Sequence, residues 1–211
     1  MKVSAVVLAE ESGKQRKKLS AAFSPKENGL LRAAMLEDVL TALKSSKISE
    51  IVIVGSYSYI PIVATKYGVS FISARPTRSN SFVKNIFSRC WDAVLVLSTN
   101  IPLVLNNDIE TIVELGLKEP SIVLSPTLKG RASAIFINPA DLVKVWFGPA
   151  AFYKIVKKAI AEDLALKFYS SRRMTIDFDL AGDLWKLLEI ENNTVSKRVF
   201  KKISHQKNKK K

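Results

Sequence analysis

Short apolar runs rich in valine and isoleucine alternate along the chain with longer stretches whose apolar residues recur every three or four positions. The short runs are typical of buried strands, and the longer stretches of helices with one side facing a core. This alternation favours an α/β fold with a largely parallel sheet. The expected strands are 3–9, 50–54, 69–72, 93–98, 121–125, 132–137 and a late one near 174–178.

The best-marked helix is expected to begin after Ser24. Pro25 suits the first helical position, and Glu27 can complete a capping box with Ser24. Leucines and valines at three- and four-residue spacing then indicate its buried side. Further helices are expected at 81–89, 107–117, 150–162, 180–189 and 195–203.

The positive charge is unevenly distributed. Eight basic residues and no acid lie in 196–211, which leaves +6 of the net charge of +14 for residues 1–195. Because no linker rich in glycine, proline or serine divides the chain, we expect one domain at 1–190 and a basic tail at 191–211, partly helical or disordered. The tail suits either nucleic-acid binding or a merely solubilising role.

The chain has one cysteine, Cys90, and one histidine, His205. These counts exclude a histidine-based triad in the domain, a Cys/His catalytic pair and a metal site rich in either residue. Without an internal disulfide the chain suits a reducing cytosol, so a cytoplasmic location is expected. The first apolar run is short and followed by acids, which indicates a strand rather than a signal peptide, and no run is long enough to span a membrane.

Cations follow the first predicted strand. Lys14, Arg16 and Lys18 lie in a loop that precedes a helix, where fixed positive charge suits a triphosphate. The same composition also fits a loop whose charges only face solvent.

Oxygen-bearing side chains occur at two further places. Asp177 and Asp179 project to the same side of an extended backbone, and paired carboxylates suit Mg²⁺. Asp179 also fits the cap of the following helix. Asn100 follows the predicted strand 93–98, where open α/β sheets bind ligands, although it also fits an ordinary turn.

Several of these segments together resemble the 2-phospho-L-lactate guanylyltransferase (CofC-type) family of coenzyme F-420 biosynthesis. The matching segments are the basic loop and helix at 13–40, Asn80, the strand and turn at 94–103, Phe147-Gly148-Pro149, and Asp177-Phe178-Asp179 with Asp183-Leu184. The resemblance implies a nucleotidyltransferase-like fold, that is, a GT-A-like and Rossmann-like three-layer arrangement around a mostly parallel mixed sheet.

The resemblance also implies an activity: transfer of GMP from GTP to a phosphorylated three-carbon acid, with Mg²⁺ as cofactor and pyrophosphate as second product. It further implies the roles of individual residues and leaves a homodimer open. Those residues are Lys14, Lys18 and Asp177 for catalysis; Lys14, Arg16, Lys18 and Asn80 for the nucleotide; Arg131, Ser133 and Gly148 for the acceptor acid; and Asn100, Asp177 and Asp179 for the metal.

The chain differs from the family pattern at three places. Asn100 stands at the Asp of D-x-P, residues 130–133 read G-R-A-S where the family has G-G-T-N, and Ala151 replaces a serine. These differences leave two hypotheses: an enzyme with an altered acceptor, or an inactive family member that binds a nucleotide or nucleic acid through the basic tail as a regulatory protein. Arg131, a new cation, is suited to an acidic substrate.

Overall fold

The computed structural model describes residues 1–9, 22–74, 91–143, 151–178, 181–191 and 193–208. Within these residues one mixed sheet has the strand order β3-β2-β1-β4-β6-β5-β7. Only β6 runs antiparallel to its neighbours among these strands. The strands are β1 (Val3–Ala9), β2 (Glu50–Gly55), β3 (Ser70–Ser73), β4 (Ala93–Ser98), β5 (Ser121–Pro126), β6 (Ala132–Asn138) and β7 (Leu166–Phe168).

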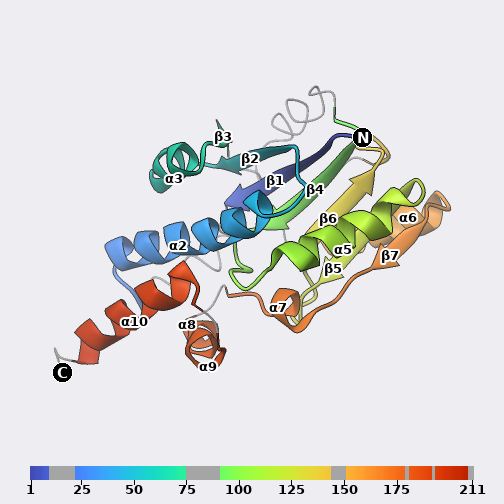
Figure 1. Cartoon of the computed structure of the whole chain (residues 1–211). Helices are drawn as coiled ribbons and strands as arrows, with labels where there is room; N and C mark the ends of the chain where they lie inside the picture. The colour runs from blue at the N-terminus through green and yellow to red at the C-terminus, as the bar shows by residue number, and fades with distance from the viewer. Residues whose placement is uncertain (10–21, 75–90, 144–150, 179–180, 192, 209–211) are drawn as a thin grey trace.

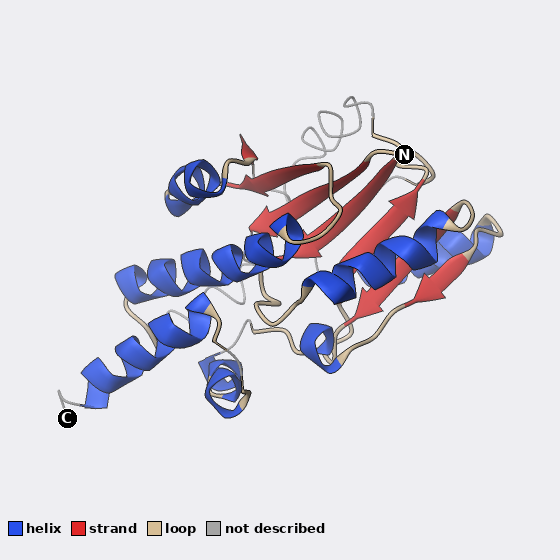
Figure 2. Cartoon of the chain, viewed as in Figure 1, coloured by secondary structure: helices blue, strands red, loops and turns tan. Residues whose placement is uncertain are grey.

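Helices cover both faces of the sheet, as Figures 1 and 2 show. On one face lie α2 (Pro25–Lys44), α3 (Tyr59–Tyr67) and α5 (Asn106–Leu117), which share a core with the sheet. On the other face α6 (Ala151–Ala161) packs against a second core. The three-layer α/β fold predicted from the sequence is therefore confirmed.

Local sequence explains how the longest helix begins. The Ser24 hydroxyl accepts a hydrogen bond from the Glu27 backbone N–H at 3.3 Å, and the Glu27 carboxylate accepts one from the Ser24 N–H at 2.7 Å. Pro25 occupies the first turn, where its missing N–H removes no hydrogen bond. The predicted capping box is thus present at the start of α2.

Helix α7 (Arg172–Thr175) contributes Met174 to the first core. A third apolar cluster lies beyond the sheet, around α2 and the C-terminal helices α8 (Ala181–Leu184), α9 (Lys186–Glu189) and α10 (Val195–Asn208). Phe200 and Ile203 of α10 are buried in it with Leu31 and Met35 of α2. The cluster therefore joins residues from both sides of the predicted boundary at 190. Figure 1 shows α10 lying beside α2.

An acidic side chain of α2 caps the start of α10. The Asp38 carboxylate accepts hydrogen bonds from the backbone N–H groups of Val195 at 2.6 Å and Ser196 at 3.0 Å. Burial raises the pKa of Asp38, although these two bonds act in the opposite direction. Asp38 thus satisfies N–H groups that a helix start leaves without intrahelical partners.

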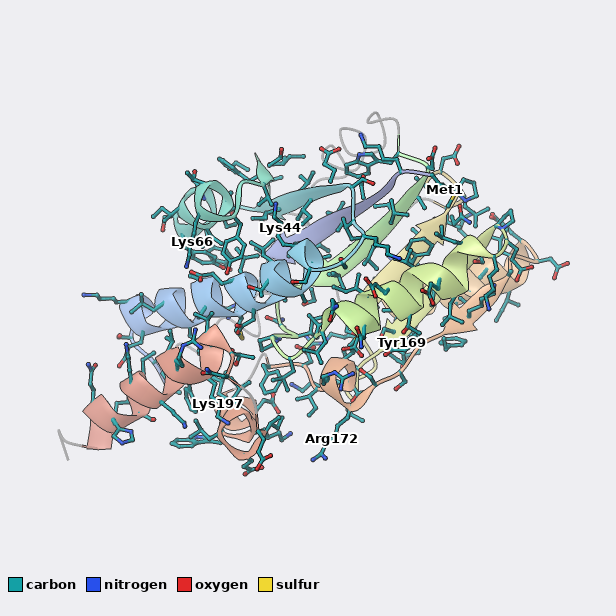
Figure 3. The ribbon with its side chains drawn as sticks, in the orientation of Figure 1. Met1, Lys44, Lys66, Tyr169, Arg172 and Lys197 are labelled. Atoms are coloured by element: carbon teal, nitrogen blue, oxygen red, sulfur yellow. The ribbon has the colours of Figure 1, made fainter. Side chains whose placement is uncertain are left out.

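Part of the basic tail is used within the fold. Lys197, labelled in Figure 3, donates to the Ile190 carbonyl. Arg198 donates to the Asn193 carbonyl at 2.7 Å. Lys207 lies 3.6 Å from a Glu27 carboxylate oxygen and 4.5 Å from the centre of the Phe23 ring. The Lys207 contacts hold the end of α10 beside the start of α2, whereas Lys197 and Arg198 bind the segment that precedes α10.

Two sequence predictions were wrong, and two elements were not predicted. Residues 172–175 form α7 and 176–178 belong to no strand, because their backbone bonds go to loops rather than to a strand. The helix predicted at 180–189 is broken at Trp185 into α8 and α9. Helix α3 and strand β7 were missed, and the helix predicted at 81–89 lies outside the described residues. None of the described helices is long and apolar enough to cross a membrane.

Candidate functional site

One edge of the sheet brings three distant segments together. Leu8 pairs with Ser98 in parallel register, so β1 and β4 end at this edge. Because β6 runs antiparallel to β4, with Ala134 opposite Leu97, the turn between β5 and β6 lies at the same edge. Ligands of open α/β sheets bind where parallel strands end.

The turn at 127–131 is closed by its own hydrogen bonds. The Thr127 N–H donates to the Arg131 carbonyl at 2.7 Å, and the Arg131 N–H donates to the Thr127 hydroxyl at 3.2 Å. Gly130 has a φ of 69°, a left-handed conformation that glycine adopts without a steric penalty. The turn therefore holds Lys129 and Arg131 on either side of a glycine at the edge of the sheet.

The late segment 175–178 connects this turn to the loop after β4. The Leu128 N–H donates to the Thr175 carbonyl at 3.0 Å, and the Phe178 N–H donates to the Asn100 carbonyl at 2.9 Å. The Phe178 side chain is fully buried in the third apolar cluster. This anchoring holds Asp177 between the turn and the loop that carries Asn100.

Two cations of the turn contact Asp177, and one of them also contacts Asp183 of α8. Arg131 Nη2 lies 2.5 Å from Asp177 Oδ2, and these side chains are only 21% and 8% exposed. Lys129 Nζ donates to the Asp177 carbonyl at 2.8 Å and to Asp183 Oδ2 at 2.6 Å. Because the Arg131–Asp177 pair is largely removed from water, loss of either partner would leave a poorly solvated charge.

Asn100 and Asp177 offer oxygen donors suited to a divalent cation. The Asn100 Oδ1 atom is buried and has no hydrogen-bond partner among the described residues, which is unusual for a buried polar atom. Mg²⁺ prefers such oxygens and usually keeps waters or takes substrate phosphates for the rest of its shell. In the part of the chain that the structure describes, no three acidic, histidine or cysteine side chains cluster to hold an ion alone. Asn100 and Asp177 can therefore supply part of the coordination shell of a divalent ion.

The buried carboxylate of Asp108 connects segments that lead to this site. Asp108 of α5 accepts from Arg173 Nε at 2.9 Å and Nη2 at 3.0 Å, from the Tyr169 hydroxyl at 2.7 Å and from the Leu105 N–H at 2.9 Å. Burial raises the pKa of Asp108, but these hydrogen bonds outweigh burial and hold the pKa below its ordinary value. The network ties the loop after β4 to the segment that leads to Asp177.

The structure brings three predicted site residues, Asn100, Arg131 and Asp177, to one edge of the sheet. Ser133 lies further along β6, where its buried hydroxyl donates to the Ser125 carbonyl at 3.0 Å. The other predicted site residues lie outside the described ones, and their roles stay predictions. They are Lys14, Arg16, Lys18, Asn80, Gly148 and Asp179.

Lys129, Asp108 and Arg173 were not among the residues predicted from the sequence. A signal for Lys129 was present, because two cations flanking a glycine between predicted strands indicate a turn that presents positive charge. The pairing of Asp108 with Arg173 joins residues 65 positions apart, and no local pattern indicates it.

A groove of about 1150 Å³ lies elsewhere, between α2, the loop at 102–106, α7 and residues 186–198. None of its lining residues is a predicted site residue. Two of its cations already have acceptors, since Arg173 binds Asp108 and Arg198 binds Asn193. The sheet edge, rather than this groove, is therefore the candidate functional site.

Known proteins resemble this chain over nearly its whole length. A phosphoenolpyruvate guanylyltransferase of Thermobaculum terrenum is 24% identical over 202 residues, which cover 93% of this chain and 87% of the relative. A 2-phospho-L-lactate guanylyltransferase of Methanocaldococcus jannaschii is 21% identical over 204 residues, which cover 96% and 90%. The structure of a nucleotidyl transferase from Methanothermobacter thermautotrophicus superposes with a TM-score of 0.68 at 15% identity and covers 89% of this chain and 96% of that one.

The structural likeness at 15% identity supports the fold alone. Membership of a family is shown by a different comparison, because the family model described as "Guanylyl transferase CofC like" matches residues 2–211. The match includes both the sheet edge and the C-terminal helix that packs on α2. The chain thus belongs to the CofC-like guanylyl transferase family.

Proposed function

We propose that this protein is a nucleotidyltransferase that transfers GMP from GTP to a phosphorylated three-carbon acid. A phosphate oxygen of the acid forms a bond to the α-phosphorus of GTP, the bond to the β-phosphate breaks, and pyrophosphate leaves. The observation that carries the proposal is the convergence of Asn100, Arg131 and Asp177 at one sheet edge in a chain of this family.

The residues at this edge suit the needs of phosphoryl chemistry. Such reactions depend on in-line positioning and on neutralising spreading negative charge more than on a protein nucleophile. Asn100 and Asp177 would hold Mg²⁺, and the ion when bound would neutralise charge on the triphosphate. Lys129 supports this arrangement by holding the Asp177 carbonyl and the Asp183 carboxylate.

Arg131 suits the acceptor. Its guanidinium can bind a carboxylate or phosphate through two parallel hydrogen bonds. The curated relatives carry the names of two such acids, phosphoenolpyruvate and 2-phospho-L-lactate. Both acids bear a phosphate and a carboxylate, so both present anionic groups of the kind that a guanidinium recognises.

Pyrophosphate release tests the proposal. Purified protein with Mg²⁺ and GTP should release pyrophosphate when phosphoenolpyruvate or 2-phospho-L-lactate is added, and CTP should be a poorer donor. Asp177→Asn should abolish release, whereas Asp141→Asn, an exposed change away from this edge, should not alter it. Absence of release with both acids, in the natural chain and in Asn100→Asp, would refute the proposal.

A further inference from the structure

The carboxylate proposed to hold the metal already has a cation of the chain beside it. Arg131 Nη2 lies 2.5 Å from Asp177 Oδ2, and the carboxylate is only 8% exposed. A carboxylate so far removed from water requires a positive partner, and the guanidinium supplies one. A divalent ion on the same carboxylate would then lie close to a like charge.

The Arg131 guanidinium can move away from the Asp177 carboxylate while the turn stays closed. The turn at 127–131 is closed by bonds to the backbone of Arg131, so the side chain can change rotamer without opening the turn. Part of the Arg131 side chain, 21% of it, stays in contact with solvent. The same guanidinium would then face the phosphates or carboxylate of an incoming acid.

Because the neighbouring ligand Asn100 is uncharged, the affinity for a metal ion should depend strongly on Asp177. Asn100 supplies an amide oxygen, which is a ligand without charge, and its Oδ1 atom lacks a partner among the described residues. Asp177 therefore carries much of the negative charge that the described residues offer to a cation here. A competitor for Asp177 should accordingly have a large effect on binding.

We propose that Arg131 and a divalent cation compete for the carboxylate of Asp177, and that the bound cation releases the guanidinium for the acidic substrate. Metal binding and acceptor binding are thereby coupled through one side chain. The competition itself depends only on the described contacts, and the second part rests on the proposed function. Arg131 is in this sense a specificity residue whose availability the metal controls.

Metal titration without any nucleotide tests the competition. Free Mn²⁺ is measured by electron paramagnetic resonance with the full chain, with Arg131→Met and with Arg172→Met, a change of equal charge on the exposed side of α7 (Figure 3). Close charge pairs are coupled strongly, so Arg131→Met should bind Mn²⁺ about tenfold more tightly than the natural chain. Arg172→Met should bind as the natural chain does. Equal or weaker binding by Arg131→Met would overturn the proposal.

A spectroscopic measurement on the natural chain remains informative if Arg131→Met does not fold. The Nε–H signal of Arg131 is identified in a ¹⁵N–¹H spectrum by its loss in Arg131→Lys. Addition of diamagnetic Mg²⁺ should shift this signal, and subsequent addition of phosphoenolpyruvate should shift it again. A signal that stays unchanged while Mg²⁺ binds would overturn the competition. A shift with Mg²⁺ but none with phosphoenolpyruvate would overturn only the second part of the proposal, that the released guanidinium binds the acid. Neither result depends on whether GTP is turned over.

Discussion

Replacement of the buried Asp108 carboxylate should destabilise the domain substantially. In Asp108→Asn the side chain keeps its shape but loses its charge. Its new NH2 group, itself a hydrogen-bond donor, faces groups that also donate. The carboxylate accepts four hydrogen bonds: two from Arg173, one from the Tyr169 hydroxyl and one from the Leu105 N–H. Asp108 itself is fully buried, so water cannot replace the lost acceptor for these donors without rearrangement.

The size of the effect follows from burial and charge. Removal of one partner from a buried pair costs about 3–5 kcal/mol, and single hydrogen bonds to charged groups contribute about 1.5–3 kcal/mol. The Arg173 side chain is 43% exposed and can regain hydration, which favours the lower end of the first range. We expect a loss of about 3 kcal/mol in the free energy of unfolding, which lowers the urea midpoint by about 1 M or more.

The effect should also depend on pH. Because the pKa of Asp108 is lowered in the folded protein, its stabilisation is fully present above the ordinary value of about 3.9 and is lost as the pH falls through the folded value. Urea denaturation of the natural chain and Asp108→Asn should therefore give unfolding free energies that converge in acid, with Asp141→Asn as the exposed control. A difference below about 0.5 kcal/mol at pH 7, or one that stays constant from about pH 5 to pH 2, would refute this reasoning.

Three further substitutions probe single contacts. Asp38→Ala removes the cap of α10 and should lower the free energy of unfolding by about 1–2 kcal/mol, with faster amide hydrogen exchange in that helix. Amide exchange in α10 at the same rate as in the natural chain would contradict the capping role. Gly116→Ala places a Cβ 2.2 Å from the Phe136 ring, so it should lower the melting temperature by several degrees, whereas Gly29→Ala, which meets nothing within 4 Å, should not. Ser24→Ala should cost about 1 kcal/mol in urea denaturation through loss of the capping box, and an unchanged midpoint would exclude that contribution.

Local sequence patterns were sufficient to predict those helices and strands whose own residues determine where they lie. Strands β1 and β4 lie at the predicted residues because each is a continuous apolar run, and α2 begins at its predicted cap. The strand predicted at 174–178 failed because Phe178 is buried by a helical cluster rather than by strand pairing. Apolar residues in a short run indicate burial without showing what buries them.

The site could be predicted only in part for a related reason. Asn100 and Asp177 were identified from their places near predicted strands and from a family resemblance. The pairing of Arg131 with Asp177 depends on the antiparallel direction of β6, which brings the start of that strand to the carboxyl edge of its neighbour. Strand direction is a property of the assembled sheet, and the pattern within one strand does not indicate it.

The packing of α10 on α2 has a consequence for synthesis of the chain. Asp38 and the Val195 backbone that it caps are 157 residues apart. At about 5–20 residues per second, a ribosome needs about 8–30 s to produce the second after the first. During that interval the apolar side of α2 that contains Leu31 and Met35 has no covering helix. Until α10 has emerged, the nascent chain thus presents a hydrophobic surface of the kind that chaperones bind.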